Sequence, residues 1–151
     1  HAGGVAYLLK QQAGPVGGPH ADDGYLLESL PQTTASYASY GFPIAEAFVP
    51  DGWLSEGGKL KVGAYEFDVL HIPGHTPGHV VFYCAAEKLL IAGDVLFYES
   101  IGRTDFPRGN HADLISNITG KLLVLPEDTR VIPGHGRMTT IGHEKRHNPF
   151  L

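Results

Sequence analysis

Three apolar segments of this chain end in the same way, with a glycine placed directly before a residue that can bind metal. Residues 65–70 lead to Gly74-His75, residues 89–92 to Gly93-Asp94, and residues 130–132 to Gly134-His135. Glycine allows a sharp backbone turn at a strand end, so that the next side chain points off the end of a rigid strand. This repetition predicts a sheet in which three strand ends meet, and the three side chains with them.

Hydrophobic patterning predicts which other elements surround those strands. Alternation predicts a β-hairpin over 59–62 and 65–70, and the continuous apolar runs at 80–84 and 89–92 indicate strands buried on both faces. Apolar residues at helical spacing predict four helices. The first begins at Val5, and the others cover 21–30, 113–125 and 140–147. A short strand is expected at Val16, a last strand at 130–132, and an irregular loop over 31–50. This order is typical of an α/β sandwich.

Composition narrows the class of protein. The chain has 151 residues, which predicts one domain over 1–151. Its 16 acidic and 11 basic residues give a net charge of −5, which argues against nucleic-acid binding. The apolar runs are too short to span a membrane, which needs about 20 residues. A single cysteine, Cys84, cannot form an internal disulfide and favours a reducing, cytoplasmic compartment. Nothing in the sequence indicates an oligomeric state.

The three glycine-linked residues form a donor set that suits zinc or iron. Imidazole nitrogens bind such ions at ~2.0–2.1 Å and carboxylate oxygens at ~2.0–2.2 Å, and one carboxylate can bridge two ions. We therefore expect His75, Asp94 and His135 to converge on a metal site. His71 and His79 flank His75. Prolines exclude a helix there, so orientation of the ligands or loop packing is favoured over ligation for both.

These motifs carry a family resemblance. The stretch from Pro73 to His79 (PGHTPGH), Gly93-Asp94 and the Pro-Gly-His that ends at His135 resemble the later metal motifs of the metallo-β-lactamase superfamily. The stretch GRTDFPRG from Gly102 and the closing HNPF resemble its short glyoxalase II-like hydrolases. The resemblance implies an αββα sandwich that is incomplete here, because the N-terminal strands and the first metal motif are absent. The first residue is His rather than Met, so we expect an N-terminally truncated domain over 1–151.

The resemblance also implies a site and a reaction. His1 resembles the last histidine of the missing motif, so the implied metal ligands are His1, His75, Asp94 and His135, with Asp94 catalytic. The complete protein would hold two Zn²⁺, with Fe or Mn possible. It would hydrolyse a small-molecule thioester of the S-lactoylglutathione type through a metal-bound hydroxide. The chain alone holds only part of this centre and can be inactive.

Substrate contacts and competing functions stay open at this point. Arg103 and Arg108 can bind a substrate carboxylate, or Arg103 can simply pair with Asp105 in a solvated loop. One alternative is a persulfide dioxygenase-like enzyme with one iron, which shares the Gly-Arg-Thr-Asp-Phe stretch but usually continues with Gln-Gln, where this chain has Pro107-Arg108. Another is a metal-binding module without turnover.

Two further signals are judged structural. His143, Glu144 and His147 fit the zinc-protease pattern H-E-x-x-H. The segment lies among charged residues just before Asn148-Pro149, which indicates an ordinary helix with a solvated face. No G-x-S-x-G nucleophile turn occurs, and Cys84 is expected to be a buried core residue.

Overall fold

The computed structural model describes residues 2–11 and 14–151. The chain divides into two compact units, His1–Trp53 and Leu54–Leu151, and each is described by itself. The single domain expected over 1–151 stays a prediction. Within the described residues, every helix falls short of the length and apolar character that crossing a membrane requires.

The first unit is helical. It contains α1 (Val5–Gln11), the 3₁₀ turn η1 (Ala21–Asp23), α2 (Gly24–Glu28), α3 (Leu30–Ala35) and the 3₁₀ turn η2 (Ala38–Tyr40). The helix expected from Val5 is confirmed, but the buried face that its apolar spacing indicated is not, because no residue of α1 is buried and Leu8 is 63% exposed. The irregular loop expected over 31–50 is wrong at its start, because α3 occupies that stretch. Pro31 lies in the first turn of α3, where its fixed φ suits a helix and no backbone N–H is needed. The strand expected at Val16 is reduced to one bridge between Gly17 and Gly52.

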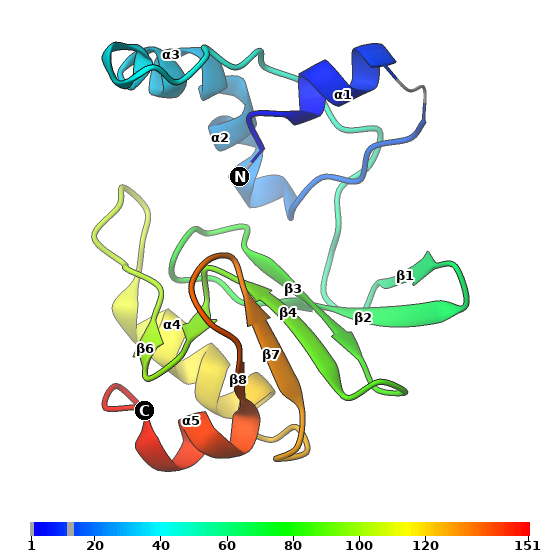
Figure 1. The fold of residues 1–151 in the computed structure, drawn as a ribbon, viewed down its shortest axis with the longest axis vertical. Coiled ribbons are helices and arrows are strands. Elements are labelled where there is room, and N and C mark those ends of the chain that lie inside the picture. The colour runs from blue at the N-terminus through cyan, green and yellow to red at the C-terminus, as the bar shows by residue number, and fades with distance from the viewer. Residues whose placement is uncertain (1, 12–13) are drawn as a thin grey trace. The chain divides into compact units, whose positions relative to one another are not determined.

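The second unit is built on a six-stranded sheet (Figure 1). Its strands are β1 (Lys59–Val62), β2 (Tyr65–His71), β3 (Val80–Cys84), β4 (Leu89–Gly93), β7 (Arg130–Pro133) and β8 (Thr139–Thr140), and they lie in that order across the sheet. All neighbours are antiparallel except β4 and β7, which run parallel. The expected bounds of β1, β2, β3, β4 and β7 therefore hold to within one residue, because an alternating pattern or a continuous apolar run marked each of these strands.

The connection from β4 to β7 contains the elements that complete this unit. A short hairpin, β5 (Leu96–Phe97) and β6 (Ser100–Ile101), is followed by α4 (His111–Asn117) and the π-helical turn η3 (Ile118–Leu122). The helix α5 (Ile141–His147) follows β8. The helices expected over 113–125 and 140–147 are thus found with shifted ends. The β5–β6 hairpin and β8 were not expected, because two-residue strands are too short to show an alternating pattern.

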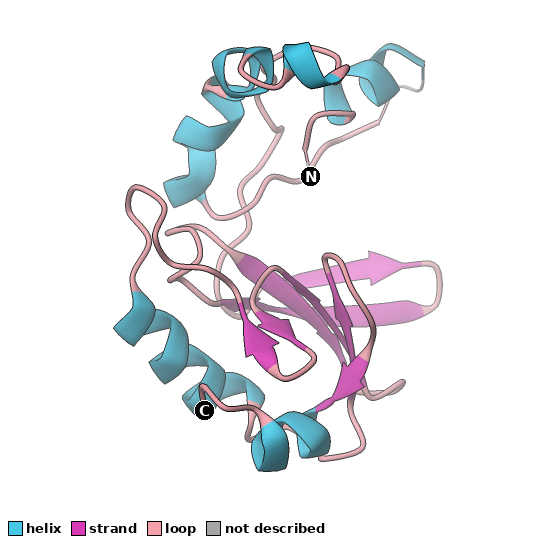
Figure 2. Cartoon of the chain, turned by 60° about the vertical axis from the view of Figure 1, so that its left-hand side comes forward, coloured by secondary structure: helices cyan, strands magenta, loops and turns pink. Residues whose placement is uncertain are grey.

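The helices α4 and α5 cover one face of the sheet (Figure 2). Buried residues from the strands, Val81, Leu90 and Val131, pack there in one cluster with Leu114 and Ile141 of the helices. The expectation that β4 is buried on both faces is wrong, since Ile91 is 38% exposed. The sheet therefore has one helix-covered face.

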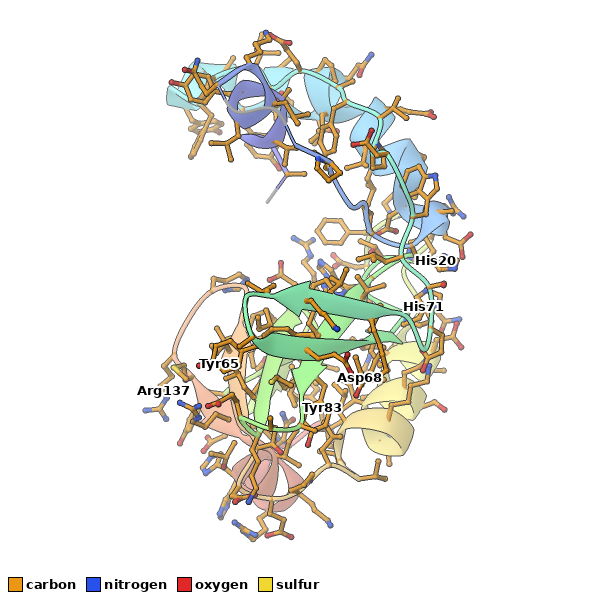
Figure 3. All side chains as sticks on the ribbon, turned by 90° about the vertical axis from the view of Figure 1, so that its right-hand side faces the viewer. His20, Tyr65, Asp68, His71, Tyr83 and Arg137 are labelled. Carbon is orange, nitrogen blue, oxygen red and sulfur yellow. The ribbon has the colours of Figure 1, made fainter. Side chains whose placement is uncertain are left out.

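The free edge of the sheet at β1 carries lysine. Lys59 Nζ lies 2.6 Å from Glu66 Oε1 and 3.1 Å from Asp68 Oδ1, both on β2. Asp68 is in turn the cross-strand partner of Tyr83 on β3 (Figure 3). A charged side chain on an edge strand opposes the addition of a further strand from another molecule.

Candidate metal centre

His75, Asp94 and His135 converge in the second unit, although they are far apart in sequence. His75 lies in the loop from β2 to β3, Asp94 follows β4, and His135 follows β7. The Nε2 atom of His75 lies 3.8 Å from Asp94 Oδ2, and the Nε2 atom of His135 lies 3.7 Å from Asp94 Oδ1. Because β4 and β7 are parallel neighbours, their carboxyl ends meet at the same edge of the sheet. The expected convergence is therefore confirmed.

The His75 ring is held by a neighbouring loop. Its Nδ1 donates a hydrogen bond to the carbonyl oxygen of Arg103, at 2.8 Å. The ring of Phe106 meets it edge-on, with centroids 5.4 Å apart. This hydrogen bond fixes the tautomer and leaves Nε2 directed toward Asp94, which is the usual arrangement of a metal-binding histidine.

Asp94 is positioned through its backbone by His79. The Asp94 N–H donates to His79 Nε2 at 3.1 Å. The His79 ring lies so close to the backbone that a Cβ on Gly93 would stand 2.8 Å from His79 Nε2, and Gly93 has a left-handed φ of +51°. Burial lowers the pKa of His79 to about 4, so the ring is neutral and can accept this hydrogen bond.

Gly134, the glycine before His135, has a different role from that of Gly93. Its φ is not left-handed, but a Cβ there would lie 2.2 Å from Asp94 Oδ1. The glycine before His135 therefore gives the Asp94 carboxylate room, whereas the glycine before Asp94 gives the backbone its turn. The sequence pattern predicted one role for all three glycines, and the structure separates two.

The donor set fits a divalent metal. Two ligand atoms that each lie ~2.1 Å from one ion are at most about 4.2 Å apart, and the two His–Asp separations of 3.8 and 3.7 Å fall within that span. They are also too long for hydrogen bonds. Each carboxylate oxygen of Asp94 thus faces one imidazole nitrogen, as a bridging carboxylate would.

The other residues that the sequence singled out are placed as follows. His71 Nε2 contacts the carbonyl oxygen of Pro77 at 2.8 Å, across the base of the His75 loop.

The Arg103 guanidinium binds Asp105 through two hydrogen bonds of 2.7 Å and lies 4.3 Å from the Phe106 ring centroid. This is the local pairing that the sequence left open. Arg108 is exposed in the same loop, with a φ of +67°. His1 lies outside the described residues.

The solvated face expected around the H-E-x-x-H segment is wrong for Glu144, which is fully buried. Its carboxylate accepts hydrogen bonds from the Thr139 hydroxyl (2.5 Å), the Asn148 amide (2.8 Å) and the Glu99 backbone N–H (2.9 Å). These donors lie outside the motif, so the motif itself gave no sign of them. Hydrogen bonds of this kind around a buried carboxylate are typical of a structural role.

Comparison with known proteins shows the family to which this chain is similar. A family profile described as the metallo-beta-lactamase superfamily matches residues 1–135. The hydroxyacylglutathione hydrolase GloC of Haemophilus influenzae is 49% identical over 150 residues, which cover 98% of this chain and 69% of that protein. Two solved structures, the BLEG-1 B3 metallo-beta-lactamase and TTHA1623 in a di-iron-bound form, match with TM-scores of 0.86 and 0.85 at 43% and 39% identity. The alignments cover 99% and 100% of this chain, and 71% and 72% of those chains.

This chain therefore belongs to the metallo-β-lactamase superfamily. The expected resemblance and the α/β fold class are confirmed. The chain is shorter than these relatives, and it is similar both to a named hydroxyacylglutathione hydrolase and to a protein that was solved with two irons.

Proposed function

We propose that the protein is a metal-dependent hydrolase of thioesters, of the glyoxalase II type that acts on S-lactoylglutathione. One observation carries the proposal. The two carboxylate oxygens of Asp94 face the Nε2 atoms of His75 and His135, at 3.8 and 3.7 Å. The 49% identity with a hydroxyacylglutathione hydrolase supports the substrate class. Since the chain spans 69% of that relative, the activity is proposed for the whole protein.

The proposed ligands are His75 and His135, with Asp94 as the bridging and catalytically essential carboxylate. His1 is proposed as a further ligand on the resemblance alone. Zinc is the proposed metal, and iron is supported as an alternative by the di-iron-bound relative. Bound divalent ions would supply Lewis acidity, which polarises a carbonyl group and acidifies water.

The chain's own residues provide the fixed geometry around this chemistry. Hydrolysis of a thioester adds water across the C–S bond and releases a carboxylic acid and a thiol. The described residues offer no activated thiol for a covalent route, since Cys84 is fully buried within β3. We therefore propose direct attack by water, with His75 fixed by the Arg103 carbonyl and Asp94 fixed by His79.

Arg103 and Arg108 are proposed to bind an anionic group of the substrate. Arg103 would have to exchange Asp105 for a substrate carboxylate, because both of its hydrogen bonds to Asp105 are in place. Arg103→Ala and Arg108→Ala should then raise KM for the thioester more than they lower kcat. We also propose that the protein acts in the cytoplasm on a small molecule, with neither nucleic acid nor membrane as a partner.

The experiment that tests the proposal compares two substrates. The purified whole protein, loaded separately with Zn²⁺ and Fe²⁺, is incubated with S-lactoylglutathione and with glutathione persulfide. We expect loss of the thioester absorbance, release of free glutathione and no oxygen uptake. Turnover of the persulfide alone, with oxygen uptake and one iron bound, would establish the dioxygenase alternative. Metal binding without turnover of either compound would leave a binding module.

A further inference from the structure

His135 is the most exposed of the three convergent side chains. It is 69% exposed, whereas His75 and Asp94 are each 14% exposed. A hydrogen bond to the Arg103 carbonyl fixes the ring of His75. The ring of His135 instead stacks on Phe97 of β5, with centroids 4.6 Å apart and an angle of 29° between the rings. Two of the three donors are thus oriented by different physical means.

Tyr98, the residue after Phe97, contacts the loop that carries His135 as well. Its partner is Arg137, two residues after His135. The guanidinium carbon of Arg137 lies 3.2 Å from the centroid of the Tyr98 ring, a cation–π contact. Arg137 lies on the loop that joins β7 to β8 (Figure 3). Consecutive aromatic residues of the β5–β6 hairpin therefore hold positions 135 and 137 of the loop that carries a proposed ligand.

The C-terminal helix α5 and the residue that follows it also contact this hairpin. The Tyr98 ring stacks on His143 of α5, with centroids 4.7 Å apart. The buried Glu144 carboxylate accepts the Glu99 N–H at 2.9 Å, and the Asn148 amide donates to the Ser100 carbonyl at 3.0 Å. Every residue from Phe97 to Ser100 thus has a contact that restrains it.

We propose that the β5–β6 hairpin is a positioning platform for the His135 loop, in which Phe97 orients the His135 ring and Tyr98 holds the loop through Arg137. The inference rests on the proposed metal centre, because it assigns His135 as a ligand. Phe97 is a positioning residue, since it acts on the metal through His135. A stacked aromatic pair contributes about 0.5–1.5 kcal/mol, so loss of the Phe97 ring should weaken metal binding by about 2- to 10-fold.

The test compares Phe97→Leu, which keeps apolar volume but removes the ring, with Phe97→Tyr, which keeps the ring. The first readout is the NMR chemical shift of the His135 ring protons in metal-free protein, assigned with His135→Ala. Ring currents from Phe97 should shift these protons upfield in the wild type and in F97Y, and the shift should be lost in F97L. Phe106→Leu is the matched control, because it removes the aromatic neighbour of His75 and should leave the His135 signals unchanged.

The second readout is Zn²⁺ affinity, measured by competition with a chelator. We expect F97L to bind about 2- to 10-fold more weakly and F97Y to match the wild type. Unchanged His135 shifts together with unchanged affinity in F97L would overturn the platform. If F97L does not fold, the variants Tyr98→Leu and Tyr98→Phe are compared instead. Only Tyr98→Leu should change the chemical shifts of the His135 ring protons. Equal His135 shifts in the two variants would refute the proposal. Failure of the wild type to bind metal would contradict the metal centre, while the shifts would still test the platform.

Discussion

The His79 ring accepts the backbone N–H of Asp94 at 3.1 Å, so the proposed bridging carboxylate is positioned by a histidine that is not among the predicted ligands. This contact joins the end of the His75 loop to the end of β4. It leaves both carboxylate oxygens of Asp94 directed at His75 and His135. The sequence favoured two roles for His79, orientation of the ligands and loop packing. Its contact with Asp94 matches the first of these.

The stability of the metal-free protein should fall as the pH is lowered from about 6.5 to about 4. Burial lowers the pKa of His79 from 6.5 to about 4 in the folded state, so the unfolded chain binds more protons in this window. The contribution is fully present above pH 6.5 and amounts to at most about 3 kcal/mol. Urea unfolding of the wild type and His79→Asn across this range measures it. The variant should show a flatter dependence, with exposed His111→Asn as control; parallel curves for His79→Asn and the wild type would contradict the burial argument.

Asp94→Asn should abolish metal binding while the fold is retained. The amide keeps the shape of the side chain and the backbone N–H to His79, but it removes the charge that faces both histidines. We expect metal affinity to drop by more than about 100-fold, because even indirect contacts to metal ligands are worth 10- to 100-fold. Metal content after dialysis and far-UV circular dichroism give the two readouts. Asp128→Asn, an exposed carboxylate paired with Lys88, is the matched control. A variant that kept its metal would show that Asp94 is not a ligand.

Gly134→Ala should damage the site through a steric clash alone. The added Cβ would lie 2.2 Å from Asp94 Oδ1, so either the carboxylate or the His135 loop has to move. Metal binding should weaken at least about tenfold, since even the loss of an indirect contact to a metal ligand costs about 10- to 100-fold. Gly120→Ala is the control, since no atom lies within 4 Å of its added Cβ. Equal metal affinity of the two alanine variants would mean that the clash is relieved without cost.

Glu144→Ala should destabilise the fold by about 3 kcal/mol, because it leaves three donors around a buried site without their acceptor. The midpoint of urea unfolding provides the measurement. Glu87→Ala, an exposed glutamate in the turn between β3 and β4, should leave the midpoint unchanged. Equal midpoints for the two variants would show that the Glu144 hydrogen bonds contribute no net stability.

The sequence could predict the strands and the three convergent side chains because their signals are local. Apolar alternation or a continuous apolar run marks the longer strands, and a glycine directly before His75, Asp94 and His135 marks three strand ends. The parallel pairing of β4 and β7 then brings two of these ends together. The resemblance added the family, which the comparisons confirm.

The parts that sequence reasoning missed depend on contacts between distant residues. The carbonyl group that orients His75 belongs to the backbone of Arg103, so no side-chain type reveals it. Phe97 is 38 residues from His135 and lies in a two-residue strand. Glu144 has charged neighbours in sequence, and its burial depends on donors from Thr139, Asn148 and Glu99.

The parallel pairing of β4 with β7 also determines when the centre can form during folding. Asp94 and His135 become neighbours only after the intervening hairpin and α4 have crossed over the sheet, and contacts of such long sequence separation form slowly. The loop with His75 joins β2 and β3, which pair over a short sequence separation, so we expect it to form earlier. The ability to capture metal should therefore appear late in refolding, in step with the β4–β7 pairing, and metal would then favour the completed sheet over its precursors.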